Sequence, residues 1–599
     1  MSPKQTFGNI SVKIALYCVG LEELNAQRLN GTATPSYSTV ISYLLASAVT
    51  QPFIATTSDI WGTQTKVLWL SVATLVGGSI ICALSQSPVL ILAGLTLQGL
   101  GSGGMISLVQ VISDRLVPSR RRPGGHCIVS ASWAIGSVAG PFIGSKLAST
   151  ATFYRLALFN TPLCGLSLAL IPWVVPSCGS STQCSWLRVD WEGMVLFLSS
   201  VSSLVFGITW SGVNFAWTSK FTFLTIAIGS SGIILFIIWE RNVAEFPIFQ
   251  ATLFRKASQI AAYFYCCFQG AIFSCLLYFL PFYFASVQRR TPRQSTLCIL
   301  PFSCSLLLGK VSSQVIIGYR PHKEILKVGW ILTILGLGFL LLLEIDTALP
   351  TQILVLAIGG LGTGWLLSAV SFQTTTDRCS SSSGPAMYWF FQNFGMCLGV
   401  VVGGKVFRST MAHFLTKYGV STSIARDPES YVQELHLLDE TDSVLQAILQ
   451  AYLGGFHGVF YMLLSLSVLG FALTIVDEVT AISEFEGAQF EEIFAGMRAQ
   501  VGAASTQRLA DPSWQPIAEE LKSKFCCDKA QLYKVYGALP LPWRPRPESG
   551  TLIVVKRLGN KASNWQIGEK YNLKDYYDFR GNALILLLGR DDCLRRSGT

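Results

Sequence analysis

The sequence of 599 residues predicts an all-α protein that crosses a membrane many times. Hydrophobic residues make up 51% of the chain and charged residues only 13%, against about 25% charged residues in a soluble globular protein. The apolar residues gather in runs of about 20, the length that an α-helix needs to span a bilayer. The 16 cysteines and five histidines show no spacing typical of zinc, so neither a metal site nor a cofactor is expected.

Thirteen apolar runs are long enough to span, and a damaged or missing first helix would bring the number to 14. Most of them contain glycine, which membrane helices tolerate because neighbouring helices pack closely against it. The runs are Tyr37–Thr57, Val67–Ser87, Pro88–Ile112, His126–Leu147, Leu156–Pro176, Gly193–Gly212, Phe221–Trp239, Ser258–Ala285, Leu297–Gly318, Leu326–Ile345, Thr351–Phe372, Met387–Phe407 and Phe456–Val476.

Lysine and arginine in the short loops predict the orientation. Alternate loops, beginning with the one after Thr57, carry 13 positive charges against six in the loops between them, so the first set is expected in the cytoplasm. Residues 477–599 then form a cytoplasmic tail, with candidate strands at Thr551–Val555 and Ala583–Leu588, and 408–455 form a long external loop. The net charge of +10 fits cytoplasmic loops rather than a nucleic-acid surface.

The N-terminus does not fit this pattern. Residue 37 has to start outside, and the run before it, Ile10–Leu21, is too short to span comfortably and contains Lys13. Residues 1–36 are therefore expected to be an atypical N-terminus. Asn9 and Asn30 each begin an N-glycosylation acceptor triplet.

Several spans carry short motifs at their ends or centres. The motifs are Ser58-Asp59-Ile60-Trp61-Gly62, Gln98-Gly99-Leu100-Gly101, Gly136-Ser137-Val138-Ala139-Gly140-Pro141-Phe142-Ile143-Gly144, Gly359-Gly360-Leu361-Gly362-Thr363-Gly364 and Gln392-Asn393-Phe394-Gly395. In this order they resemble the major facilitator superfamily, and more narrowly its fungal fourteen-segment drug:proton antiporters, which include toxin and secondary-metabolite efflux pumps.

The resemblance implies two helical bundles, 37–176 and 258–476, around a central cavity, with two linker helices in 193–239. It assigns gating and transport to Asp59, Gln98 and Gly101 and to the antiporter signature of Gly136, Gly140, Pro141 and Gly144, which is associated with export. The structural alternative for the signature is plain packing, because glycines four residues apart let two helix backbones approach closely. Asp59 alternatively lies as a solvated acid in a loop.

Two departures concern proton coupling. Leu95 stands where the family places an arginine, and the positions after Gly62 are Thr63 and Gln64 instead of basic residues. One charge, Lys310, falls inside an apolar run; it either reaches the cytoplasmic end of its helix or lines the cavity. The candidate cavity residues are Trp133, Gln269, Lys310, Gln392 and Asn393, and helix packing is the alternative for each.

The predicted function is efflux of a small amphipathic organic compound, a fungal secondary metabolite or toxin, by proton antiport. Two alternatives stay open: uptake of a siderophore or similar solute, and a degenerate membrane protein that transports nothing. No Ser/His/Asp arrangement or phosphate-binding glycine loop is present, so no enzyme is expected. The expected partners are the small-molecule substrate, the lipid bilayer and protons, with no nucleic acid. The protein is expected to be a monomer of the plasma membrane, with a vacuolar or vesicle membrane as the alternative.

Overall fold

The computed structural model describes most of the membrane-spanning part of the chain. It covers residues 36–61, 64–85, 87–116, 136, 153–174, 189–211, 218–244, 247–249, 257–317, 322–376, 383–436, 438, 443–503, 531–535, 552–557, 565–567 and 583–587. The chain divides into two compact units, Met1–Glu478 and Val479–Thr599.

The first unit is built from helices. Those before residue 250 are α2 (Ser36–Trp61), α3 (Gln64–Leu84), α4 (Pro88–Leu116), α6 (Phe153–Val174), α7 (Trp191–Trp210) and α8 (Lys220–Asn242). Those after it are α9 (Ala257–Ser286), α10 (Pro292–Leu297), α11 (Leu300–Ile317), α12 (His322–Leu340), α13 (Leu349–Thr376), α14 (Ser383–Lys417), the 3-10 helix η5 (Thr422–Arg426), α15 (Pro428–Leu435) and α16 (Ser443–Ala503). Among the described residues, 10 helices are long and apolar enough to cross a membrane.

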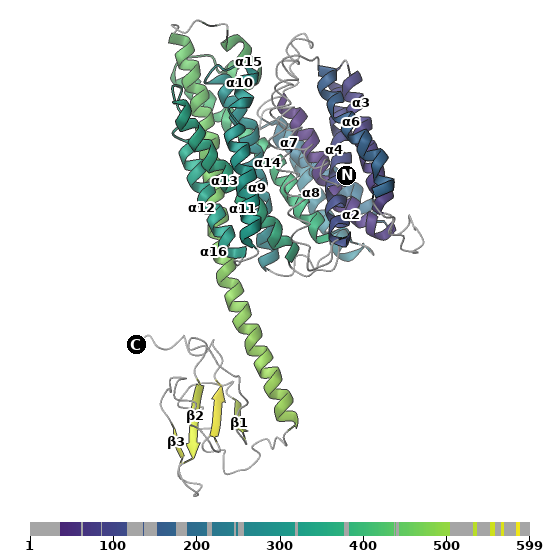
Figure 1. Ribbon diagram of the computed structural model, residues 1–599, viewed down its shortest axis with the longest axis vertical. Helices are drawn as coiled ribbons and strands as arrows, with labels where there is room; N and C mark the ends of the chain where they lie inside the picture. Colours follow the sequence, from purple (N-terminus) through teal and green to yellow (C-terminus); the bar gives the residue numbers. More distant parts are fainter. Residues whose placement is uncertain are drawn as a thin grey trace. The chain divides into compact units, whose positions relative to one another are not determined.

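Two groups of helices stand side by side, as expected for two bundles. Figure 1 shows α2, α3, α4 and α6 in one group and α9, α11, α12 and α13 in the other, with α7, α8 and α14 between them. Helix α14 packs against both α9 and α2, and α7 contacts α2 and α14. The line along which α2 meets α14 is called the seam below.

Every expected span coincides with a helix except His126–Leu147, which lies outside the described residues apart from Gly136. The expected loop at 408–455 is corrected, because α14 continues to Lys417 and α15 and the start of α16 occupy much of the remainder. Helix α16 also continues to Ala503, well into the expected tail. The expected N-terminal feature at 1–36 lies outside the described residues except for Ser36.

The second unit contains an antiparallel sheet, so the chain is not all-α beyond its membrane part. Its strands are β1 (Gln531–Val535), β2 (Leu552–Arg557), β3 (Trp565–Ile567) and β4 (Ala583–Leu587), in the order β1-β4-β2-β3. Leu552 pairs with Leu587 and Gln531 also pairs with Leu587, so β4 lies between β2 and β1. Both strands expected from the sequence are confirmed as β2 and β4.

Glycines set how closely the helices of the first bundle approach one another. A Cβ atom added to Gly99 or Gly103 of α4 would lie less than 3.0 Å from the backbone of α2, at Tyr43 and Ser47 respectively. One added to Gly101 would lie 2.6 Å from the carbonyl oxygen of Ser71 on α3. Helix α4 therefore packs backbone to backbone against two neighbours at once.

The second bundle repeats this arrangement. A Cβ atom added to Gly360 or Gly364 of α13 would lie less than 3.0 Å from the backbone of α11, at Phe302 and Leu306. One added to Gly362 would lie 2.5 Å from the backbone nitrogen of Thr333 on α12. We call α2–α4 and α11–α13 the two three-helix units, which both lie within Met1–Glu478. They are matched helix by helix.

A third glycine row joins α14 to α9. Gly395, Gly399 and Gly403 of α14 lie against Cys267, Ala271 and Cys275 of α9, each pair one helical turn further along. The ring of Tyr263 stacks on that of Phe391 at 4.8 Å one turn earlier in the same register. The two helices therefore run parallel in close contact.

Candidate transport site

Buried amide side chains gather on the helices that meet at α14. Helix α2 carries Gln51, α9 carries Gln269, and α14 itself carries the neighbouring Gln392 and Asn393. All four are at most 3% exposed. We call Gln51, Gln269, Gln392 and Asn393 the seam amides.

The seam amides lack the hydrogen bonds that buried polar groups normally make. Within the described chain, neither amide atom of Gln51 or of Gln269 has a hydrogen-bond partner. The same is true there of Gln392 Oε1 and Asn393 Nδ2. An unsatisfied buried polar group costs about 1–3 kcal/mol, so a hydrogen-bond partner for these atoms would stabilise the protein.

Two of the seam amides, Gln51 and Gln392, lie at a similar depth in their helices. Gln51 is 10 residues before the end of α2 and Gln392 is nine after the start of α14, which is about 15 Å and 14 Å along the helices. Helix α7 shows that these two ends lie on the same side of the bundle. Its Trp191 contacts Phe53 of α2 at 5.5 Å and its Phe197 contacts Phe390 of α14 at 5.7 Å.

An aromatic cluster fixes the linker helices to this end of the seam. Phe249, which follows α8, lies 5.2 Å from Phe197, 5.6 Å from Phe236 and 5.7 Å from Phe390. Asp190 caps α7 by accepting a 2.8 Å hydrogen bond from the backbone nitrogen of Gly193, and it also accepts one from Trp239 Nε1 of α8. The linker helices are therefore joined to each other and to both bundles.

Lys310 is buried on α11 at the position that matches Gln51. Gly99 and Gly103 face Tyr43 and Ser47 on α2, and one further turn leads to Gln51. Gly360 and Gly364 face Phe302 and Leu306 on α11, and one further turn leads to Lys310. The Lys310 side chain is 4% exposed, and its backbone carbonyl accepts hydrogen bonds from Ser313 and Ser368.

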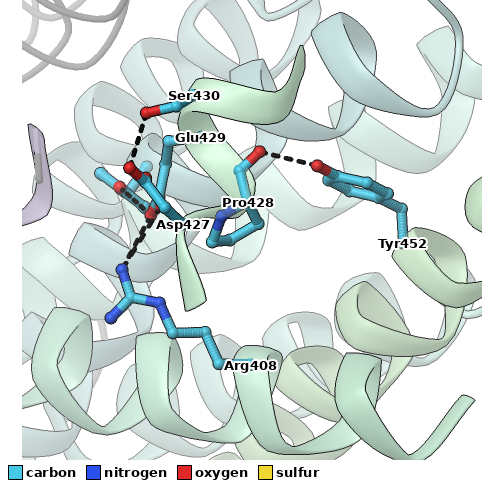
Figure 2. A network of polar contacts seen from close by, with 7 residues as sticks. Arg408, Asp427, Pro428, Glu429, Ser430 and Tyr452 are labelled. Atoms are coloured by element: carbon cyan, nitrogen blue, oxygen red, sulfur yellow. Dashed lines mark hydrogen bonds and ion pairs between the residues drawn. The ribbon is translucent and has the colours of Figure 1, made fainter. Parts of the chain in front are cut away.

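A second polar cluster lies where α9 and α14 end, in the segment expected to be a loop (Figure 2). Glu429 of α15 accepts hydrogen bonds from Tyr278 of α9 at 3.1 Å and from Arg408 of α14 at 3.3 Å. Tyr452 of α16 donates to the Pro428 carbonyl oxygen at 2.7 Å. These contacts explain why the segment is structured.

Asp427 lies beside this ion pair and accepts a 2.7 Å hydrogen bond from Ser430. Burial raises the pKa of Asp427, and the Ser430 hydrogen bond opposes this shift. The sequence offered no signal for this pairing, because Glu429 lies 21 residues after Arg408 and α14 carries other basic residues, Lys405 and Lys417.

Ion pairs join α12 to α16 at the other end of the second bundle. Lys323 Nζ lies 3.4 Å from Asp477 Oδ2, and Lys327 Nζ lies 2.5 Å from Glu478 Oε2. The matching loop of the first bundle, after Asp59, carries Thr63 and Gln64 instead of a pair of basic residues.

The structure places some of the predicted site residues and not others. Gln392 and Asn393 lie on α14 and Gln269 lies on α9, the helix that packs against it, whereas Lys310 lies on α11. Gln98 is fully buried on α4 against Gly78 of α3, and Gly101 is a packing position. Asp59 lies in the last turn of α2, and Gly136 is buried in helical conformation. Trp133, Gly140, Pro141, Gly144, Asn9 and Asn30 lie outside the described residues.

Sequence reasoning missed Gln51 as a member of the site. Its only signal was its place before Pro52 in an apolar run, which does not distinguish a site from a helix end. The glycine contacts of α4 and α13, which relate Gln51 to Lys310, appear only in the folded protein.

Comparison with known proteins agrees with this architecture. The profile of the Major Facilitator Superfamily matches residues 14–404. The MFS transporter L2 of Phoma sp. is 31% identical over 405 residues, which cover 67% of this chain and 68% of that protein. The MFS efflux transporter aclA of Aspergillus oryzae is 26% identical over 451 residues, covering 73% and 81%. The efflux pump dotC of Dothistroma septosporum is 27% identical over 417 residues, covering 68% and 71%.

A solved structure shares the fold at low sequence identity. It is a bacterial homolog of the human lysosomal transporter Spinster in an inward-facing, occupied conformation, with a TM-score of 0.50 and 14% identity over 80% of this chain and 96% of that chain.

Two bundles of membrane-length helices define a multi-pass membrane protein, and the family match places it in the transporter class. The chain belongs to the Major Facilitator Superfamily, whose members are transporters of small molecules rather than enzymes. The match begins at residue 14 and so includes part of the stretch before Tyr37, where a damaged first helix stays a prediction.

Proposed function

We propose that this chain is an efflux transporter that exports a small amphipathic organic compound, a fungal secondary metabolite or toxin, from the cell. The observation that carries the proposal is the set of uncharged buried amides around α14, because such groups suit an amphipathic solute better than a highly charged one. Relatives named as efflux transporters support the export direction.

The antiporter signature also supports export. Gly140 and Pro141 stand together in it, and proline removes a backbone donor and bends its helix. Proton exchange rests on the family alone, since a buried leucine, Leu95, occupies the position of the expected arginine. The proposed site of action is the plasma membrane, and the proposed state is a monomer.

The test is deletion of the gene in its native host, with metabolites inside the cells and in the medium measured by mass spectrometry. We expect at least one apolar metabolite to be retained by the deletion strain and released again when the wild-type gene is restored. Restoration with Gly140→Leu or Pro141→Leu should fail although both variants reach the membrane. Unchanged distribution of every metabolite would contradict export.

Proton exchange has its own test in inside-out membrane vesicles, to which the metabolite retained by the deletion strain is added from outside. Uptake into the vesicles should depend on an acidic lumen and stop when a protonophore collapses the pH gradient. Uptake that persists with the protonophore would leave export standing and remove proton antiport.

A further inference from the structure

We propose that the segment 421–436, which we call the outer strap, is a pH-sensitive latch that docks on α9, α14 and α16 more firmly in acid than at neutral pH. Asp427 is the group that binds the proton. The outer strap contains η5 and α15 and lies in the segment predicted to be external. The inference concerns regulation and goes beyond the proposed export.

The first turn of α15 connects the outer strap to three helices. Glu429 accepts hydrogen bonds from Tyr278 of α9 at 3.1 Å and from Arg408 of α14 at 3.3 Å (Figure 2). Tyr452 of α16 donates to the carbonyl oxygen of the neighbouring Pro428 at 2.7 Å. Two consecutive residues of the strap therefore hold α9, α14 and α16 together.

The remainder of the outer strap is fixed by apolar burial and by one further hydrogen bond. Ala425 is 6% exposed and Leu435 is fully buried. Arg289, which follows α9, donates to the carbonyl oxygen of His436 at 3.3 Å. A short segment docked by few contacts opens at a small cost in free energy, so a change of one charge among these contacts shifts its docking equilibrium.

Asp427 is the charge in this network that lacks a cation of its own. Its Oδ2 accepts a hydrogen bond from Ser430 at 2.7 Å, and its Oδ1 is buried with no hydrogen-bond partner within the described chain. Arg408 lies 3.3 Å and 3.4 Å from the two carboxylate oxygens of Glu429. Glu429 is therefore the partner of Arg408, and its negative charge repels that of Asp427.

Other charged groups near the outer strap do not supply the missing cation. In the described parts of the strap and of the helices packed against it, the other charged or titratable groups are Arg426, Glu434 and His436, Lys405, His413 and Lys417 of α14, Tyr278 of α9, and Tyr452 and His457 of α16. Arg426, the neighbour of Asp427, is exposed, and water screens such charges. The charges that act on Asp427 in this part of the chain are those of Glu429 and Arg408.

The docked strap therefore favours the neutral form of Asp427. Burial raises the pKa of this carboxyl above the ordinary aspartate value of about 3.9, to which it returns when the strap is released into water. Between these two pKa values the docked strap binds more protons than the released strap. Docking is therefore strongest below the ordinary value and weakens as the pH rises through the raised one.

The first experiment measures hydrogen exchange of the peptides that cover 421–436, in the purified full chain in lipid nanodiscs. After correction for intrinsic exchange, the wild-type strap should open at least about threefold more often at about pH 7.5 than at about pH 5. Asp427→Asn removes the charge and keeps a residue suited to a helix N-terminus, so its opening should change by less than about twofold. The matched control Glu434→Gln removes an exposed charge of the same helix and should behave as the wild type.

Equal pH dependence in Asp427→Asn and in the wild type would overturn the proposal. More frequent opening of the wild-type strap in acid would overturn it as well, because it would show that the charged form of Asp427 stabilises docking.

The second experiment loosens the outer strap without changing any charge. Tyr452→Phe removes the hydrogen bond to Pro428, so the strap should open about fivefold more often at both pH values. The ratio between the two pH values should stay as in the wild type. Unchanged opening in Tyr452→Phe would show that these contacts do not hold the strap, and a lost pH ratio would show that Asp427 is not its source.

These outcomes are separable from those of the transport test, because neither experiment uses a substrate. A strap that opens with pH as expected, without metabolite retention in the deletion strain, would refute export and keep the latch. Retention in the deletion strain with a strap that ignores pH would keep export and refute the latch.

Discussion

The three-helix units α2–α4 and α11–α13 have the same backbone packing but differ in the polar side chains that they bury. In each, the third helix uses two glycines four residues apart against the first helix and one glycine between them against the second. Even the buried leucine one turn before this row, Leu95 in α4, has its counterpart in Leu356 of α13. Close helix packing therefore constrains both units equally, because added side-chain atoms would separate the backbones.

The polar groups at matched positions differ. Gln51 of α2 corresponds to Lys310 of α11, so one unit buries an amide where the other buries an amine. The first turns of α12 carry Lys323 and Lys327, which pair with α16, whereas Thr63 and Gln64 stand between α2 and α3 instead of a pair of basic residues. The comparison teaches that packing and chemistry vary independently in this chain, and exchanging residues between the units tests this separation.

The largest effect is expected from moving the charge. Gln51→Lys places a second ammonium at a fully buried position, so it should lower the stability by more than about 3 kcal/mol and reduce the amount of folded protein in the membrane. The reciprocal exchange, Lys310→Gln, removes a buried amine and should reduce the folded amount less than Gln51→Lys does. Size-exclusion chromatography of the two detergent-solubilised variants decides this, and equal recovery of both would show that the positions are not chemically distinct.

The next effect concerns the shared glycines. Gly103→Ala and Gly364→Ala each place a Cβ atom against a carbonyl oxygen of the neighbouring helix, so both should destabilise the protein by about 1–3 kcal/mol. The matched control is Gly338→Ala on α12, where an added Cβ meets nothing within 4 Å. It should be neutral or stabilising by up to about 1 kcal/mol. Thermal unfolding in nanodiscs measures all three, and a much smaller loss at one of the two glycines would break the proposed match between the units.

The smallest effect is expected at the two ion pairs between α12 and α16. Asp477 has a 3% exposed side chain and Glu478 a 33% exposed one. Asp477→Asn should therefore cost about 1–2 kcal/mol, whereas Glu478→Gln should cost less than about 1 kcal/mol because water screens an exposed pair. Raising the salt concentration should weaken the Glu478 pair more than the Asp477 pair. The opposite order in thermal unfolding would show that the buried pair contributes nothing to holding α12 against α16.

The spans were predictable because each depends on local sequence. A run such as Phe221–Trp239 is apolar throughout, and a helix is the structure that satisfies its backbone hydrogen bonds in lipid without help from another segment. The segment 408–455, predicted as a long loop, contains the end of α14, α15 and the start of α16. Arg408 and Glu429 pair within it across 21 residues, and such a pairing has no periodic signal in the sequence.

The candidate site was predictable in part. Gln269, Gln392 and Asn393 were identifiable as polar residues in apolar runs. The sequence could not distinguish an amide that is hydrogen-bonded within the protein, such as Gln352, from one that is not, such as Gln269. That distinction depends on which atoms of other helices come within hydrogen-bonding distance.

The sequence by itself determined that the chain is a multi-pass helical membrane protein, where most of its spans lie, and which family its motifs resemble. These properties follow from composition and run length, since the hydrophobic thickness of a bilayer acts on each segment separately. Only the tertiary structure decided that Gln51 matches Lys310, that α14 joins the two bundles, and that the amides of Gln51 and Gln269 have no hydrogen-bond partner within the described chain. These are relations between helices far apart in the chain, and glycine contacts and burial fix them only when the helices pack together.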